Sequence, residues 1–310
     1  MLRKTDYLLV PAAAVLFGIN QPLSRVLIDE VLPAKYLAAA RMIAVALVFS
    51  VWMLLRYRDQ IPRGRELAML IVYGVFGIAV LQWMLTEAIA RLDVGLALTI
   101  GYTAPLLSAL WCLVVRKQHQ PRLVWLLMAL AMLGLALALG VGGDTLKDLP
   151  VAGILFAFGV AVMFAYYALH GEVLLRTSPA PVVLGVAAPV AAIFWTLTFA
   201  PLWAFPTEAL SEDMSLGGNL SHIVLPGSAV LLWSMTVGTA LPYRLYLAGV
   251  GRVGPTFGLL SGTIEPIVAV IAAWIWIDQV LTLLQVLGCA IVFASVIAVQ
   301  VARSRQPVTA

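Results

Sequence analysis

Apolar residues occupy ten long runs along the chain, and each run is separated from the next by a short polar or glycine-containing break. Each run is close to the roughly 20 residues that a membrane-spanning helix needs. The pattern therefore predicts an all-α polytopic membrane protein with ten transmembrane helices. The predicted spans cover residues 7–28, 34–55, 67–89, 94–115, 122–142, 150–172, 181–204, 225–249, 254–277 and 282–302.

Composition strengthens this interpretation. The 310 residues are 63% hydrophobic and 11% charged, with a mean hydropathy of +1.02, whereas soluble domains carry roughly 25% charged residues. A core this apolar needs lipid as its solvent. The net charge of +4 does not indicate a nucleic-acid partner, because the basic residues lie in short loops. The first run is too long for a cleavable signal peptide and is expected to stay as an anchor.

The distribution of basic residues predicts the orientation. With the N-terminus in the cytoplasm, thirteen Lys and Arg residues fall in inner loops and tails and three in outer loops. Under the positive-inside rule, both termini are then cytoplasmic. The three outer residues are Lys35, Arg91 and Lys147, and another three, Arg25, Arg41 and Arg244, fall inside predicted spans.

The two halves of the chain resemble each other. Pro105 and Pro266 are 161 positions apart. Arg91 and Arg252, which precede the spans that contain these prolines, are also 161 positions apart. Each half holds five predicted spans, and because five is odd, the second copy must cross the membrane in the opposite direction. We therefore predict two inverted five-helix repeats, residues 1–145 and 146–310. Inverted repeats are typical of secondary transporters, whose substrate site lies near the midplane between the repeats.

Glu265 is the most informative single residue. It lies directly before Pro266 in a run with no other charged residue. A carboxylate inside a membrane span is costly and commonly serves a proton relay, a substrate contact or an ion site. Pro266 also leaves a backbone carbonyl one turn earlier without its helical donor, and Pro105 does the same in the first half. The structural alternative is a protonated Glu265 that bonds to a neighbouring helix and holds a kinked span in place.

Other intramembrane polar residues concentrate in predicted spans 1, 3, 4, 6, 8 and 9, whereas spans 5 and 10 are almost purely apolar. This asymmetry predicts a cavity surrounded by the first group, although hydroxyl groups in membranes also simply join helices. The candidate substrate-binding or coupling residues, besides Glu265, are Asn20, Ser24, Gln82, Tyr102, Thr103, Tyr166, Tyr243, Arg244 and Ser261. Gln21 belongs to the same polar group in span 1 as Asn20 and Ser24.

Two intramembrane arginines have competing interpretations. Arg41 is expected to extend to the outer interface, since long basic side chains reach it easily. Its alternatives are binding a substrate carboxylate or pairing with an acid such as Glu87. Arg244 is expected to reach the cytoplasmic headgroups, and its nearness to Tyr243 leaves a gating role open. Glu87 either lines an outer opening, on a stripe with Gln82, or pairs at the interface with Arg91.

Three segments resemble the drug/metabolite transporter superfamily, EamA-like family. They are LTIGYTAPL (98–106), GTALPY (238–243) and SGTIEP (261–266), and within that family they are most similar to the bacterial threonine/homoserine exporter type. The resemblance implies ten spans in two repeats and export of a small metabolite. The chain departs from the family pattern at Asp278-Gln279, where Gly-Glu is usual, and at Arg244, where a small polar residue is expected.

Together these features predict a secondary transporter of the bacterial inner membrane that exports small metabolites, amino acids or related compounds, by alternating access and with proton coupling through Glu265. The alternative solutes are cationic drugs or nucleoside-like metabolites. The remaining alternatives are a passive channel, a lipid-acting enzyme, for which no catalytic constellation is found, and a non-transporting scaffold, against which the scattered intramembrane polar residues argue. No P-loop or Rossmann glycine pattern stands out, so we expect no cofactor. The three histidines are far apart in sequence, so we expect no metal. We expect a monomer, or a homodimer through spans 5 and 10.

Overall fold

The computed structural model describes residues 7–115, 117, 122–138, 149–253 and 261–304. Within these residues, helical segments occur in all ten predicted runs. Five continuous helical stretches are long and apolar enough to cross a membrane, namely 34–56, 65–91, 94–114, 151–174 and 180–198. The structure therefore shows a largely helical protein with five clear spans, and the count of ten stays a prediction. The predicted boundary at residues 145 and 146 lies outside the described residues.

The helices follow the chain in the order α1 (Leu9–Glu30), α2 (Ala34–Arg56), α3 (Arg65–Val72), η3 (Tyr73–Val80), α4 (Leu81–Arg91), α5 (Val94–Gly101), α6 (Ala104–Val114), α7 (Arg122–Ala138), α9 (Val151–Leu174), α10 (Ala180–Thr198), α11 (Thr207–Ser211), α12 (Gly227–Met235), η6 (Thr236–Ala240), α13 (Leu241–Val253), α15 (Ile264–Ile277) and α16 (Leu283–Ser304). Short 3₁₀ turns are η2 (Arg58–Gln60), η4 (Leu202–Ala204) and η5 (Gly218–Leu220). The strands are β1 (Asp213–Ser215) and β2 (Val224–Pro226).

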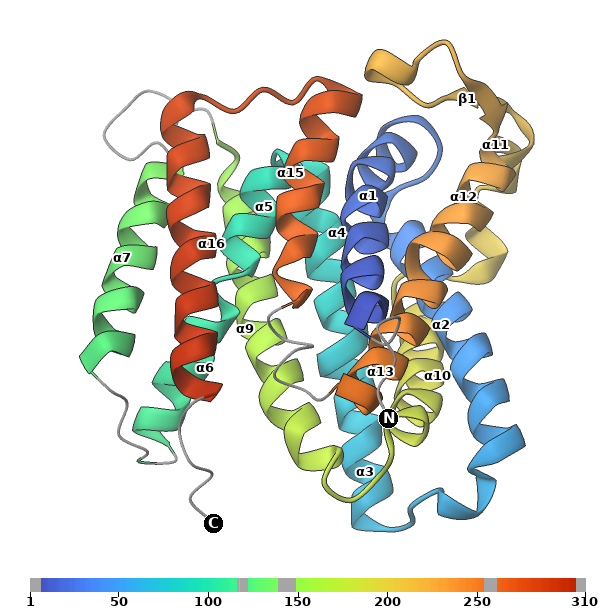
Figure 1. Cartoon of the computed structure of the whole chain (residues 1–310). Coiled ribbons are helices and arrows are strands. Elements are labelled where there is room, and N and C mark those ends of the chain that lie inside the picture. The colour runs from blue at the N-terminus through green and yellow to red at the C-terminus, as the bar shows by residue number, and fades with distance from the viewer. Residues whose placement is uncertain (1–6, 116, 118–121, 139–148, 254–260, 305–310) are drawn as a thin grey trace.

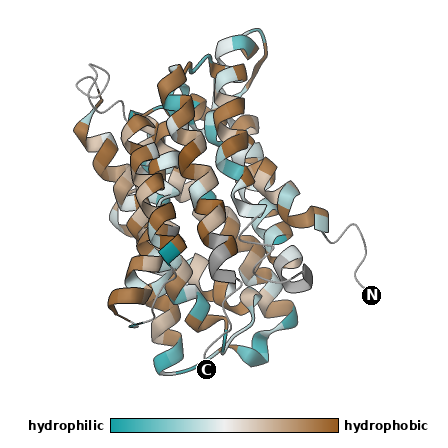
Figure 2. Cartoon of the chain, turned by 60° about the vertical axis from the view of Figure 1, so that its left-hand side comes forward, coloured by the Kyte–Doolittle hydropathy of each residue, from teal (hydrophilic) through white to brown (hydrophobic). Residues whose placement is uncertain are grey.

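Helix α1 lies in the centre of the bundle, between α15 on one side and α12 and α13 on the other (Figure 1). Helices α7 and α16 pack side by side along one flank, and α2 packs against α10 at the opposite flank. The start of α1 and the end of α16 both lie toward the bottom of Figure 1. Brown, apolar ribbon covers most of the length of the helices in Figure 2, as expected for elements that face lipid.

Several helices are interrupted inside the predicted spans. Helix α5 ends at Gly101 and α6 begins at Ala104, with Pro105 in its first turn. Helix α15 begins at Ile264, with Pro266 in its first turn. The wider π-helical turns η3 and η6 occur inside the third and eighth predicted spans. Such turns are frequent at functional sites, and their matching positions in the two halves agree with a repeated unit.

The segment after the seventh predicted span contains a short hairpin, which the all-helical prediction missed. Strands β1 and β2 pair antiparallel, with Met214 opposite Leu225. Gly217 and Gly218 have φ values of +69° and +50°, which glycine adopts without steric cost. The loop they form contacts the end of α15, because Asn219 Nδ2 donates to Ile275 O at 2.9 Å. This segment therefore covers one end of α15.

Candidate functional site

Glu265 lies between three helices at the interior of the bundle. It is the second residue of α15, so its carboxylate lies at a helix N-terminus, where the macrodipole favours negative charge. Its two oxygens accept hydrogen bonds from Gln21 Nε2 of α1 at 3.1 Å and from Tyr102 Oη, after α5, at 2.9 Å. The carboxyl group therefore faces neighbouring helices rather than lipid, as both interpretations of Glu265 require.

Asn20 connects α1 to the interrupted helix around η6. Pro242 has no N–H group, so the Gly238 carbonyl lacks its α-helical donor. Asn20 Nδ2 donates to that carbonyl at 2.9 Å and to Thr239 Oγ1 at 3.3 Å. Ser234 Oγ in turn donates to Asn20 Oδ1 at 2.9 Å. An amide side chain thus satisfies the backbone that the proline leaves open.

Arg41 lies inside the bundle, and the expectation that it reaches the outer interface was wrong. It is only 3% exposed. Its Nη2 donates to Ser234 Oγ at 3.1 Å, to Asn20 O at 3.3 Å and to Ser24 Oγ, and its Nε lies 3.4 Å from Ser234 Oγ. Oxygen atoms of α1 and α12 accept the hydrogen bonds that lipid headgroups would accept at the interface, so the side chain remains inside the bundle.

We call this group of contacting residues the α1 cluster. It consists of Asn20, Gln21, Ser24, Arg41, Tyr102, Ser234, Thr239 and Glu265. Two adjacent residues of α1 touch the two charges: Asn20 contacts Arg41, and Gln21 contacts Glu265. The opposite charges are close enough to interact electrostatically. No carboxylate among the described residues forms an ion pair with Arg41.

A small cavity adjoins Arg41. Its volume is about 20 Å³, which holds about one water molecule. The bundle is therefore nearly closed here, and a solute larger than water needs the helices to separate. The lining residues are Arg41, Met42, Val45, Ile78, Gln82, Tyr167, Leu184, Thr239 and Tyr243. Two predicted site residues, Gln82 and Tyr243, thus share a cavity with Arg41.

Thr103 and Ser261 are buried at the two helix interruptions. The Thr103 hydroxyl donates to Ile100 O at 2.7 Å, so it satisfies local backbone where α5 ends. Ser261 lies in helical backbone just before the turn at Thr263 that precedes α15. Both residues are close in sequence to a residue of the α1 cluster, Tyr102 or Glu265.

Tyr166 belongs to an aromatic group rather than to the α1 cluster. Its ring stacks on His170 with centroids 5.1 Å apart. His170 and Tyr167 also stack on Tyr73, at 5.9 and 5.4 Å. Neither Tyr166 Oη nor His170 Nε2 has a hydrogen-bond partner among the described residues, although both atoms are buried. Tyr167 links this group to the cavity that it lines with Arg41.

Arg244 is the predicted candidate that the fold separates most clearly from the others. It follows Tyr243 in α13, but its side chain is exposed on the outside of the bundle. Tyr243 instead faces inward and packs edge-on against Phe17, with ring centroids 5.1 Å apart. Successive helical residues are about 100° apart, so a neighbour in sequence need not share a site.

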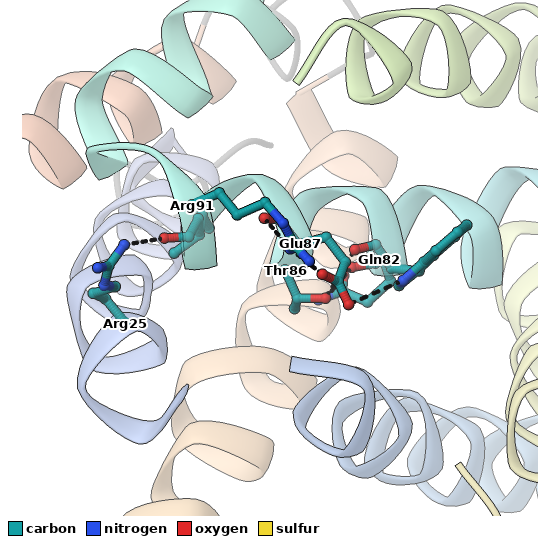
Figure 3. Close-up of polar contacts among 7 residues, drawn as sticks. Arg25, Gln82, Thr86, Glu87 and Arg91 are labelled. Carbon is teal, nitrogen blue, oxygen red and sulfur yellow. Dashed lines mark hydrogen bonds and ion pairs between the residues drawn. The ribbon is translucent and has the colours of Figure 1, made fainter. Parts of the chain in front are cut away.

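The stripe that contains Gln82 and Glu87 is seen in Figure 3. Glu87 forms an ion pair with Arg91 one turn on, and it accepts a hydrogen bond from Trp83 Nε1 at 3.2 Å. Arg25 of α1 reaches the end of α4 and donates to Ile89 O at 2.9 Å. Glu87 is therefore engaged by Arg91 and is not the partner of Arg41.

Sequence reasoning left Gln21, Ser234 and Thr239 out of the candidate list. Gln21 had a signal, because it lies between Asn20 and Ser24 in the polar group of span 1. Thr239 lies in the GTALPY segment (238–243) that carries the family resemblance. Ser234 had no signal beyond being a hydroxyl residue in an apolar run, which is common in membrane helices. Their inclusion depends on η6, whose wide turn lets Thr239 Oγ1 donate to Ser234 O at 2.8 Å. Among the described residues, no three His, Cys, Asp or Glu residues are placed to hold a metal ion.

Comparison with known proteins adds the family context. The sequence profile of the EamA-like transporter family matches residues 5–140 and again residues 151–300. The threonine/homoserine exporter RhtA of Salmonella typhimurium is 30% identical over 230 residues, which cover 73% of this chain and 69% of that protein. The RhtA protein of Escherichia coli is 29% identical over 73% of this chain and 68% of its own length.

Two further similarities extend over nearly the whole chain. An uncharacterized inner membrane transporter of Salmonella typhimurium, YicL, is 20% identical over 95% of this chain and 94% of its own length. One crystal structure superimposes with a TM-score of 0.61, covering 99% of this chain and 100% of the other at 16% identity. At that identity the structural match concerns the fold alone. The double profile match shows that the chain contains two repeats of one unit.

Proposed function

The chain belongs to the EamA-like transporter family, so it is a membrane transporter rather than an enzyme, and we propose that it exports small amino acids such as threonine and homoserine. In this proposal it is a secondary transporter of the bacterial inner membrane with both termini in the cytoplasm. Threonine/homoserine exporters are among the proteins that it resembles. One observation carries the proposal: a partly buried carboxylate at the start of a broken helix, held by donors from other helices.

The position of Glu265 suits a coupling role. The carboxyl group comes from the second predicted repeat, whereas its donors, Gln21 and Tyr102, come from the first. When one repeat moves relative to the other, the partners of Glu265 change with it. Alternating access therefore provides a means of exposing the same carboxyl group to each side in turn.

Gln21 also suits both protonation states of Glu265. Its Nε2 donates to the carboxylate, while its Oε1 is buried without a partner among the described residues. A side-chain amide that turns over presents its oxygen instead, which would accept a hydrogen bond from a protonated Glu265. The proton and a substrate ammonium group would then compete for one carboxylate, and this competition would couple export to proton entry.

The near closure of the site favours a carrier over a permanently open channel. The cavity beside Arg41 is about 20 Å³, so passage of an amino acid requires rearrangement of the helices. A carrier predicts saturable flux and exchange between labelled and unlabelled solute. A channel predicts neither.

A second candidate function is export of aromatic or cationic solutes. The stacked side chains of Tyr73, Tyr166, Tyr167 and His170 favour it, since aromatic faces attract flat or cationic ligands. Because Tyr167 also lines the cavity, this aromatic group lies beside the proposed site. Testing such solutes as competitors of amino acids distinguishes the two candidates.

The test of the proposed function is counterflow with the purified protein in proteoliposomes. Vesicles loaded with unlabelled L-threonine or L-homoserine should accumulate external labelled L-threonine, and an imposed pH gradient should drive net flux. In Glu265→Gln, exchange should no longer respond to the pH gradient. Full gradient-driven flux by this variant would show that Glu265 is not the coupling group, and absence of amino-acid counterflow in the wild type would refute the proposed substrate class.

A further inference from the structure

Arg41 is a buried cation whose hydrogen-bond partners are all uncharged. It contacts two serine hydroxyls and one backbone carbonyl, through Nη2 and Nε. Its Nη1 makes no hydrogen bond within the described residues. Buried charges are ordinarily paired with an opposite charge, because dipoles alone replace only part of the lost hydration. The guanidinium is therefore left with capacity for an anion.

The surroundings of Arg41 indicate where such an anion would bind. The side chain lines the cavity together with Gln82, Thr239 and Tyr243. These neighbours provide amide and hydroxyl groups and no competing acid. A planar guanidinium binds a carboxylate through two parallel hydrogen bonds, which gives both strength and orientation.

The other end of the α1 cluster is suited to a cation. Glu265 accepts bonds from two neutral donors, Gln21 and Tyr102. Gln21 is 4% exposed, and its Oε1 is buried without a partner among the described residues. A carboxylate and an unpaired amide oxygen are both acceptors, which is what an ammonium group with three N–H donors requires.

We propose that Arg41 binds the carboxylate of the transported amino acid while Glu265 and Gln21 receive its ammonium group. This assignment rests on the proposed function and specifies how the site recognises its solute. Asn20 and Gln21 are adjacent on α1 and touch the two charged side chains separately, so a single helix fixes both anchors. The substrate class is then a small zwitterion, and a solute that lacks either charge binds less well.

A comparison with Arg25 shows why a purely structural role explains Arg41 less well. Arg25 also lies in a predicted span, but it pairs with Asp29 at 2.8 Å and caps the end of α4 through Ile89 O. Its charge is neutralised and its contacts are accounted for. If Arg41 served only to join α1, α2 and α12, an uncharged polar side chain would do so without the cost of a buried charge.

The experiment measures competition against labelled L-threonine in proteoliposomes containing the full-length protein. The competitors are L-threonine, L-threonine amide, which lacks the carboxylate, and N-acetyl-L-threonine, which lacks the ammonium. The wild type should prefer L-threonine over its amide by about tenfold or more, since a hydrogen bond to a charged group contributes at least about one decade in affinity. Equal competition by the amide in the wild type would overturn the assignment without any variant.

Variants then locate the preference. Arg41→Gln should bind L-threonine about tenfold more weakly, whereas its affinity for the amide should not change. The ratio of the two affinities then falls to about one. Arg41→Lys should restore part of the ratio because it restores the charge. The matched control is Arg176→Gln, since Arg176 is an exposed arginine that pairs with Glu172 at 2.7 Å, and it should behave as the wild type.

The outcomes separate the two proposals. If the wild-type protein shows amino-acid counterflow but the ratio of affinities is unchanged in Arg41→Gln, only the carboxylate assignment is refuted. Absence of amino-acid counterflow in the wild type would refute the proposed function itself. If Arg41→Gln does not fold, Arg41→Lys provides the second test: an ammonium keeps the charge but cannot form the two parallel hydrogen bonds of a guanidinium, so the preference for L-threonine over the amide should fall below the wild-type value. The full wild-type preference in a folded Arg41→Lys would contradict the assignment to the guanidinium.

Discussion

The α7–α16 pair and the α1 cluster are packed in the same way but differ in the chemistry of the groups that they bring together. In both places glycine lets helices approach closely. A Cβ on Gly134 of α7 would lie 2.9 Å from Gly288 O of α16, and one on Gly18 of α1 would lie 2.7 Å from Glu265 O of α15. Around Gly134 the contact is apolar, with Ile291 as the other neighbour. Around Gly18 the same closeness brings the partly buried Glu265 carboxylate to the side-chain amide of Gln21.

The difference indicates that close packing alone does not mark a functional site in this bundle. Helix α7 buries Val124, Ala131 and Leu135 on one side, while Leu126 and Leu133 are exposed on the other at 67% and 55%. That arrangement fits a helix that faces lipid or a second copy of the chain. In the α1 cluster, by contrast, the packed groups include a buried arginine and a partly buried carboxyl group, which lipid could not solvate as charges.

The largest expected effect comes from neutralising both charges of the α1 cluster. Arg41→Gln and Glu265→Gln should each lower L-threonine exchange by at least about tenfold and by up to about 100-fold, because each removes a hydrogen bond to a charged group, worth about 1.5–3 kcal/mol, and each 1.4 kcal/mol is about a factor of ten. The double variant should be little worse than either single one, since both act on the same bound solute. Initial rates of counterflow measure this.

If the losses of exchange in the two single variants multiply fully in the double variant, the two charges act independently. That result would contradict the assignment of both charges to one site. Wild-type rates in either single variant would contradict the comparison itself, because the α1 cluster would then be as passive as the α7–α16 pair. Equal reconstitution of all the proteins must be checked by their amount in the vesicles.

A smaller loss is expected for Tyr102→Phe. The change removes one of the two hydrogen bonds to Glu265 and leaves the ring and its packing against Phe164 in place. Exchange should fall by about tenfold, the usual size for a bond to a charged group. Measured across external pH, the rate profile should shift as well. Tyr36→Phe is a suitable control, since Tyr36 packs against Phe205 outside the α1 cluster.

Gly238→Ala should act indirectly. A Cβ at this position would collide with the side-chain amide of Asn20, which must then leave the Gly238 carbonyl and disturb the support of Arg41. We expect about a fivefold loss of exchange, within the roughly 1–3 kcal/mol range for overpacking. Gly262→Ala is the matched control, because no atom of the described residues lies within 4 Å of a Cβ there. Equal rates in the two variants would contradict this role of Asn20.

The smallest effect on transport is expected in the α7–α16 pair. Gly288→Ala would place a Cβ against the backbone of Ala138 and Gly134, which should lower stability by about 1–3 kcal/mol. Exchange per folded molecule should remain at the wild-type level. Thermal unfolding in detergent measures the first effect and counterflow the second. A strong loss of exchange without loss of stability would mean that this pair takes part in the transport cycle.

Much of the site's composition could be predicted from local sequence. Glu265 stands out because a lone carboxylate beside a proline in an apolar run has few structural explanations. Asn20, Ser24 and Tyr102 belong to polar groups in spans with helical spacing. The family resemblance, confirmed by the double profile match, added the transport function but no residue roles.

Arg41 and Arg244 show where sequence reasoning fails. Both are arginines in apolar runs, and the same interfacial interpretation was favoured for both. The structure buries Arg41 at 3% exposure and leaves Arg244 exposed. A long basic side chain is compatible with either environment, so its own helix does not decide between them.

The sequence by itself determined that this chain lies in lipid, that its two halves repeat, and that an acid lies within an apolar run beside a helix break. Each of these follows from composition, period and spacing along the chain. The tertiary structure alone decided which polar groups meet. Arg41 donates a hydrogen bond to Ser234, which is 193 positions away in sequence, and Asn20 donates one to Gly238, which is 218 positions away. Contacts across such separations depend on how helices rotate and on turns such as η6, and hydropathy constrains neither of them.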